Sequence, residues 1–137
     1  IVYVCKSEPV LELYDTSLNL IKEILGPEMQ SRQKYKIEEN GNVCFLNTIP
    51  YAYSSFCYND DYFYVCYNGA YLSYKNDFDS SLLKSWIFKF DWDGNFIDSY
   101  YIDHYVKSMS LSNDGRYIYA FGTDREGGNV FYKYLLR

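Results

Sequence analysis

A short aromatic motif recurs along the chain and divides it into repeats. The tripeptide Tyr-Val-Cys occurs at residues 3–5 and again at 64–66, and the segment "RYIYAFG" (116–122) carries the same aromatic spacing. The anchors Tyr3, Tyr64 and Tyr119 lie about 61 and 55 residues apart. We interpret each repeat as one supersecondary unit, a propeller blade.

Three further series of short apolar segments accompany this motif. They are 10–15, 86–91 and 130–135; 19–25 and 95–102; and 52–58 and 106–112. Aromatic residues make up 21% of the chain, and such residues favour strands. We therefore predict an all-β fold made of propeller blades, each with four antiparallel strands.

The repeats predict a single propeller segment over residues 1–137. Residues 1–25 would supply three strands of a first blade, 52–102 a full blade, and 106–136 three strands of a third. This amounts to about two and a half to three blades. A β-sandwich is the alternative fold, which the strand order distinguishes from a propeller.

Two Asp-Gly pairs predict tight hairpins between these strands. Gly94 in "DWDGN" and Gly115 in "SNDGR" are expected to adopt positive φ, which glycine tolerates best. Asp91, Asp93 and Asn95 resemble part of a calcium loop, but the glycine comes too early and no glutamate follows at the required distance. The pattern favours a hairpin.

Composition excludes several function classes. The net charge of −5 and the sequence pI of about 4.8 oppose the phosphate neutralisation that nucleic-acid binding requires. No stretch is apolar enough for a membrane-spanning helix. The four cysteines lack Cys-x-x-Cys spacing and there is one histidine, so neither a metal site nor a cofactor is expected. Cys5 and Cys66 are interpreted as buried thiols at equivalent repeat positions, with a disulfide as the alternative.

Candidate binding residues are those expected in the loops of one propeller face, where loops converge on the mouth of the channel. They are Glu8, Arg32, Tyr67, Asn68, Asp103, His104, Asp124, Arg125 and Glu126. Solvation alone would also explain polar side chains in loops. Arg32, Lys34 and Lys36 alternate, so they could line one face of a strand and meet an anionic glycan or partner.

His104 is the one residue with a recognisable catalytic chemistry. A neighbouring carboxylate, Asp103, could orient its ring for general-base work. No serine nucleophile motif or second acid is placed to join the pair, so no catalytic residue is assigned.

Four segments of the chain resemble six-bladed, TolB-like β-propellers, a family that includes lipid-anchored proteins of bacterial cell envelopes. They are "LELYDTSLNLIKEILGP" (11–27), "YAYSSFCYNDDYFYVCYNG" (51–69), "IFKFDWDGNFIDSYYID" (87–103) and "MSLSNDGRYIYAFGTDREGGNVFYKYLL" (109–136). The order matches the C-terminal portion of that family. The resemblance implies a location in the periplasm or cell envelope and brings no established active site. Since the predicted blades are about half of such a ring, a homodimer or the remainder of a longer chain is expected to complete it.

Two functions follow from these observations. The first is a non-enzymatic binding or scaffold propeller that recognises a protein or glycan through its loop face. The second is a propeller hydrolase or lactonase with a site at the channel mouth. Such a site needs inward carboxylates or Asn on several inner strands, whereas "AYSSF" and "VKSMS" offer serine and lysine.

Overall fold

The computed structural model describes residues 1–6, 8–26, 35–45, 49–72, 84–124 and 126–136. These residues form strands, turns and connecting segments, and none of them is helical. The predicted all-β fold is therefore confirmed. All strand pairs are antiparallel, which agrees with blades built from consecutive hairpins.

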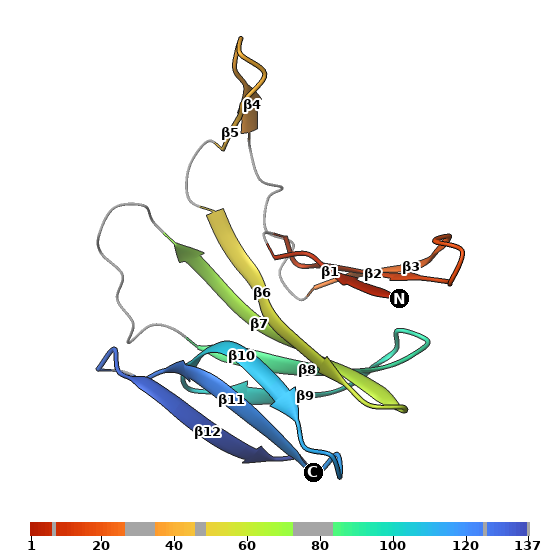
Figure 1. Ribbon diagram of the computed structural model, residues 1–137, viewed down its shortest axis with the longest axis vertical. Coiled ribbons are helices and arrows are strands. Elements are labelled where there is room, and N and C mark those ends of the chain that lie inside the picture. The colour runs from red at the N-terminus through yellow and green to blue at the C-terminus, as the bar shows by residue number, and fades with distance from the viewer. Residues whose placement is uncertain (7, 27–34, 46–48, 73–83, 125, 137) are drawn as a thin grey trace.

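The strands form three main sheets and one isolated hairpin. The first sheet has the order β1 (Val2–Val4), β2 (Val10–Tyr14) and β3 (Leu20–Leu25). The second sheet has the order β6 (Ile49–Tyr58), β7 (Tyr62–Leu72), β8 (Ser85–Asp91) and β9 (Phe96–Ile102). The third sheet has the order β10 (Tyr105–Leu111), β11 (Tyr117–Thr123) and β12 (Asn129–Leu135). Figure 1 shows the second sheet between the other two.

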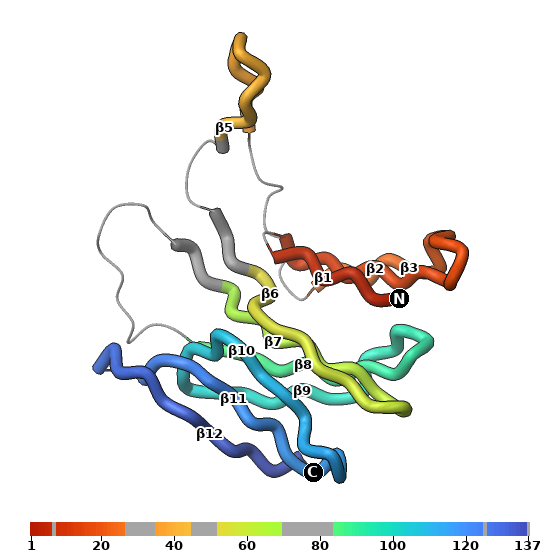
Figure 2. The backbone as a smooth tube through the Cα atoms, in the orientation of Figure 1, coloured from red at the N-terminus to blue at the C-terminus, as the bar shows by residue number. Residues whose placement is uncertain are grey.

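The hairpin of β4 (Tyr35–Ile37) and β5 (Val43–Phe45) lies between β3 and β6 along the chain. In Figure 2 the hairpin stands clear of the three sheets. Lys36 lies on β4 as the alternating pattern suggested, and its Nζ is 3.9 Å from Glu38 Oε1. Arg32 and Lys34 lie outside the described residues.

The second sheet buries both of its faces, which explains why its central strands are apolar throughout. On β7, Phe63 and Val65 pack toward the first sheet, whereas Tyr64 and Cys66 pack toward the third. The cluster between the first and second sheets comprises Leu11, Leu13, Ala52, Tyr53, Phe63, Val65, Tyr67, Phe88 and Phe90. The cluster between the second and third sheets comprises Cys57, Tyr64, Cys66, Ile87, Ile102, Val106, Met109, Ile118 and Ala120.

All four cysteines are free thiols, so the disulfide alternative is wrong. Burial raises the pKa of Cys66 to about 11 and that of Cys57 to about 12. These two side chains behave as small apolar groups of the core, because a thiolate is strongly disfavoured there. Cys5 and Cys44 are half-buried.

The cross-strand register corrects the repeat alignment at the first anchor. The β2–β3 and β8–β9 turns match, and Leu13 and Lys89 lie at the same distance before them. Their cross-strand partners are Val2 and Tyr64, and the corresponding pair of the third sheet is Tyr119–Lys133. Val2, and not Tyr3, is therefore equivalent to Tyr64. A shift of one residue turns a strand side chain to the opposite face, so Tyr3 lies on the uncovered face of the first sheet. The predicted equivalence of Cys5 with Cys66 is wrong by the same shift.

The hairpin turns share one backbone conformation. Gly94 and Gly115 have φ of 74° and 68°, which confirms the prediction for both. In the β8–β9 turn, Asp91 accepts hydrogen bonds from Asn95 through both carboxylate oxygens, as a hairpin and not a calcium loop requires. The β2–β3 turn repeats these bonds between Asp15 and Asn19. There, however, the residue with positive φ, 64°, is Leu18.

Replacing Leu18 with glycine should stabilise the protein. The left-handed conformation costs a residue with a Cβ about 1–2 kcal/mol, and the greater freedom of glycine in the unfolded chain offsets about 0.4–1 kcal/mol of that gain. We therefore expect the free energy of unfolding to rise by about 0.5–1 kcal/mol in urea denaturation. Ser17→Gly in the same turn relieves no such strain and should lower stability. A lower unfolding midpoint for Leu18→Gly would contradict the turn assignment.

Candidate functional site

The polar loop residues of the second and third sheets meet at one end of these sheets. Asp103 and His104 connect β9 to β10, and residues 124–128 connect β11 to β12. Because Tyr105 pairs with Thr123, the two connections leave the third sheet side by side. Asp103, His104 and Asp124 therefore lie at one end of the fold.

The histidine of this cluster sits between a carboxylate and an aromatic ring. His104 Nδ1 lies 2.7 Å from Asp103 Oδ1, although the two groups do not have hydrogen-bond geometry. The His104 ring lies 4.4 Å from that of Tyr132, centroid to centroid. Burial raises the pKa of Tyr132, and the charges of Asp124 and Asp103 raise it further. The carboxylates of Asp103 and Asp124 thus both disfavour the ionised form of the Tyr132 hydroxyl.

Asp124 also organises its own turn. Its Oδ1 accepts hydrogen bonds from the backbone N–H groups of Glu126 and Gly128 at 2.9 and 2.8 Å. A Cβ on Gly128 would lie 3.0 Å from Asp124 Oδ2. Glu126 is exposed in this turn, whereas Arg125 lies outside the described residues. Asp124 thus holds the backbone N–H groups of Glu126 and Gly128 through one carboxylate oxygen.

Tyr67 and Asn68 do not lie in a loop, so that prediction is wrong. Both are buried within β7, which continues to Leu72. Asn68 Oδ1 accepts a 2.7 Å hydrogen bond from the Ser85 hydroxyl, and Asn68 Nδ2 donates to the carbonyl of Val106. The apolar character that identified β7 as a strand did not reveal how far it extends.

Asn68 belongs to a buried polar network between the second and third sheets, whereas Tyr67 packs in the cluster between the first and second sheets. Ser85 Oγ accepts from the N–H of Val106 at 2.9 Å, and Ser54 Oγ donates to its carbonyl at 2.8 Å. Both backbone groups of Val106 are therefore held by side chains of the second sheet. Since Val106 follows the Asp103–His104 connection by two residues, the network also sets the position of that connection.

Two exposed aromatic residues lie at the same end of the second sheet and were missed by the sequence analysis. Trp86 and Tyr101 are opposite each other on β8 and β9, and their ring centroids lie 5.0 Å apart in an edge-on arrangement. Trp86 is 40% exposed and Tyr101 49%. The sequence did not predict that Trp86 is exposed. The segment 86–91 is apolar on both faces, and such a strand is expected to be buried between two sheets.

Glu8 is half-buried in the connection between β1 and β2, where its carbonyl accepts from Val10 N–H. The second sheet lies between the first sheet and the His104 cluster (Figure 1). The structure therefore does not bring Glu8 to that cluster.

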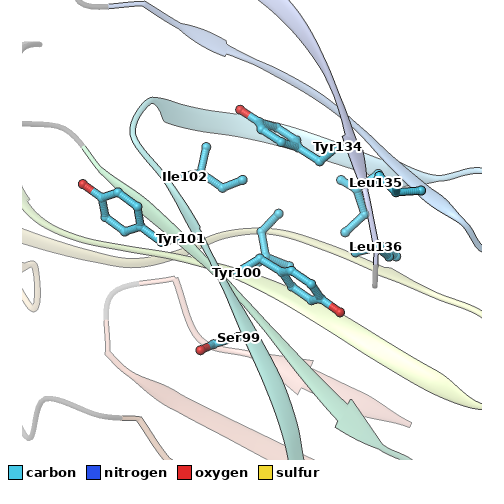
Figure 3. Close-up of a pocket in the computed structure, with 9 residues that line it drawn as sticks. Ser99, Tyr100, Tyr101, Ile102, Tyr134, Leu135 and Leu136 are labelled. Atoms are coloured by element: carbon cyan, nitrogen blue, oxygen red, sulfur yellow. The ribbon is translucent and has the colours of Figure 1, made fainter.

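A groove of about 370 Å³ lies between the second and third sheets. It is lined by Ile87, Ser99, Tyr100, Tyr101, Ile102, Ile118, Tyr134, Leu135 and Leu136. Figure 3 shows side chains of β9 and of the end of the third sheet around it. The Tyr134 hydroxyl is buried with no hydrogen-bond partner among the described residues, and burial raises its pKa. The groove is thus mainly apolar, and the Tyr134 hydroxyl in it is buried without a hydrogen-bond partner among the described residues.

Within the described part of the chain, no three His, Cys, Asp or Glu side chains are grouped so that they could hold a metal ion. The same residues include no helix that could span a membrane.

Comparison with known proteins gives one match. A family model described as TolB-like 6-blade propeller-like matches residues 1–114, which covers the first two sheets and β10. No curated protein and no solved structure matches the chain.

Proposed function

The chain belongs to the TolB-like 6-blade propeller-like family, and from this premise we propose that it is a non-enzymatic binding or scaffold propeller of the bacterial cell envelope. The family is associated with the periplasm. Residues 1–25, 52–102 and 106–136 would be three of its blades within a single propeller segment. A homodimer or the remainder of a longer chain would complete the ring.

The exposed Trp86–Tyr101 pair carries this proposal. The two rings are adjacent and both exposed, and a ring with one apolar face suits stacking against a sugar or a side chain. Asp103 follows Tyr101 by two residues, so one carboxylate comes directly after the strand that carries this ring. Carboxylate oxygens accept hydrogen bonds from hydroxyl groups. This combination supports a glycan, or a protein bearing one, as the ligand.

The His104 cluster would form the polar side of the same surface. Asp103 and Asp124 would accept hydrogen bonds from the ligand, and Glu126 would extend the acidic rim. His104 lies beside Asp103 and could donate or accept a hydrogen bond. Tyr67 and Asn68 have no place in this surface, because both side chains are buried. Tyr67 packs between the first and second sheets, and Asn68 lies in the network that joins the second and third.

The hydroxyl groups of the inner strands favour binding over hydrolysis. Ser54 Oγ donates to the Val106 carbonyl, and Ser55 Oγ accepts from the N–H of Met109 at 2.8 Å. These serines hold the second and third sheets together, so they are not poised as nucleophiles. A lactonase-type site would instead need carboxylates or amides at these inner positions.

Binding can be tested with the tryptophan fluorescence of a single-tryptophan protein. Trp92→Phe leaves Trp86 as the sole tryptophan, because the chain has two. We expect an array of purified bacterial surface polysaccharides and peptidoglycan fragments to yield ligands that change Trp86 emission. Adding Trp86→Ala to the unmodified protein should weaken binding of those ligands by about tenfold or more, since the stacking surface is lost.

Trp92 provides the matched control. It is also 40% exposed but lies in the β8–β9 turn, at the opposite end of the second sheet. Trp92→Phe should leave array binding unchanged. Equal loss of binding in both variants, or no binding to any polysaccharide or peptidoglycan fragment on the array, would reject the proposed surface.

A further inference from the structure

A row of aromatic rings runs along the last two strands of the second sheet, on the face that is turned toward the first sheet. Its members are Trp86, Phe88 and Phe90 on β8, and Phe96 and Tyr101 on β9. Phe88 and Phe90 belong to the cluster that the first and second sheets share. Trp86 lies opposite Tyr101 and Phe96 lies opposite Phe90, so these side chains leave the sheet on the same face.

Neighbouring rings of this row lie within the distances at which aromatic rings interact. The ring centroids of Trp86 and Tyr101 are 5.0 Å apart, and those of Trp86 and Phe88 are 6.5 Å apart. Phe96 continues the row, with centroid distances of 6.3 Å to Phe88 and 5.9 Å to Phe90. The Trp86–Tyr101 pair is therefore one end of a longer aromatic surface.

The two ends of the row are exposed, and its middle is buried. Trp86 and Tyr101 are exposed at one end, and Phe96 is 58% exposed at the other, whereas Phe88 between them is 8% exposed. Trp86 and Phe90 are four residues apart on β8, which corresponds to about 13 Å along a strand. A single sugar ring is too short to contact both ends, so one ligand reaches both only if it is an extended chain.

The described strands β8 and β9 place no charged side chain on this face between the two ends. Lys89 and Asp98 are cross-strand partners on the opposite face. The residue of β9 opposite Phe88 is Ser99, which is half-buried and whose hydroxyl can donate and accept. Ser99 and Tyr101 leave β9 on the side away from Tyr100 (Figure 3). Exposed rings on either side of a hydroxyl, without charge, suit a neutral sugar chain.

We propose that the ligand of the Trp86–Tyr101 surface is a neutral, β-linked glycan that runs along β9 from Tyr101 to Phe96. The inference rests on the proposed function, because it specifies the ligand of that same surface. Sugars with equatorial hydroxyls and linkages present an apolar C–H face, which removes apolar surface from water when it covers a ring. Trp86 and Tyr101 hold one sugar unit, and Phe96 holds another unit farther along the same glycan.

The dependence of affinity on glycan length tests this assignment. The probes are β-linked oligosaccharides of glucose and of N-acetylglucosamine, each as a disaccharide and as a hexasaccharide, titrated calorimetrically into the 137-residue chain. We expect a hexasaccharide to bind about tenfold tighter or more than the disaccharide of the same sugar, because the contact with Phe96 forms within one complex.

Phe96→Ala is the decisive variant. It should weaken hexasaccharide binding by about tenfold and leave disaccharide binding within about twofold of wild type, since the disaccharide occupies the Trp86–Tyr101 end alone. Phe96→Tyr keeps an aromatic ring and should bind the hexasaccharide as the wild type does. Tyr58→Ala is the matched control, because Tyr58 is an exposed aromatic residue on β6, at the opposite edge of the same sheet. It should change neither affinity.

Three results would overturn the inference. They are a hexasaccharide of either sugar that binds no better than its disaccharide, unchanged hexasaccharide binding by Phe96→Ala when circular dichroism shows it to be folded, and tighter binding of the carboxylated polymer polygalacturonate than of the neutral hexasaccharides. In each case, loss of array binding in Trp86→Ala would still support the proposed function. Array binding that survives Trp86→Ala would reject the proposed function itself.

Discussion

Replacing Phe63 with alanine is expected to lower the free energy of unfolding by about 3–5 kcal/mol. Phe63 is fully buried in β7 at the centre of the cluster between the first and second sheets. Its ring is stacked on that of Phe90 with the centroids 5.2 Å apart. Truncation removes the apolar contacts and leaves a cavity, because a sheet held on both sides cannot collapse into the space. Chemical denaturation at one fixed protein concentration measures the change.

Tyr58→Ala is the control for this prediction. Tyr58 lies on the neighbouring strand β6, is 63% exposed, and contacts the Trp92 ring edge-on at 5.9 Å. Its removal should cost about 1 kcal/mol or less, since little buried area is lost. If both variants lost similar stability, the first and second sheets would not share a packed core around Phe63.

Gly122→Ala should destabilise the protein by about 3 kcal/mol. A Cβ at this position would lie 2.1 Å from the carbonyl oxygen of Tyr105 and 3.0 Å from its carbonyl carbon. The register between β10 and β11 shifts between Val106 and Ser108, so the two backbones approach each other closely beside Gly122. The obstructing atoms belong to the backbone, and relief of the clash therefore requires the strands to separate.

Gly127→Ala separates this steric effect from backbone conformation. Gly127 lies in the turn that follows β11, has φ of 83°, and a Cβ there would meet nothing within 4 Å. Its substitution should cost about 1 kcal/mol through the left-handed conformation alone. Thermal or urea unfolding of both variants gives the comparison. A smaller loss for Gly122→Ala than for Gly127→Ala would contradict the close approach of β10 and β11.

Features that depend on neighbours in the chain were predictable from the sequence. Asp-Gly pairs require positive φ wherever a short hairpin joins two strands, so Gly94 and Gly115 could be assigned from the local sequence. The aromatic and β-branched content predicted strands, and the repeat predicted how many belong to each sheet. Asp103, His104 and Asp124 were placed at one end because consecutive antiparallel strands alternate their direction.

The face to which a strand side chain points was not predictable to the same degree. Tyr3 matched Tyr64 in sequence, yet one residue of register separates them and turns them to opposite faces. Successive side chains of a strand point to opposite faces, so an alignment that is wrong by one residue reverses the predicted face. A match of short motifs cannot exclude such a shift. The hydrogen bonds between β1 and β2 decide the register, and these involve residues distant from the motif.

By itself, then, the sequence determined the all-β class, the hairpin turns and the end of the fold at which the polar loops gather, because each depends on short-range backbone preferences. Tertiary structure alone decided that Asn68 is buried against Val106 and that Trp86 and Tyr101 are exposed as a pair. Burial is a property of what packs against a residue, and the packing partners here come from other sheets. The sequence of an apolar strand does not show whether another sheet or solvent lies against it.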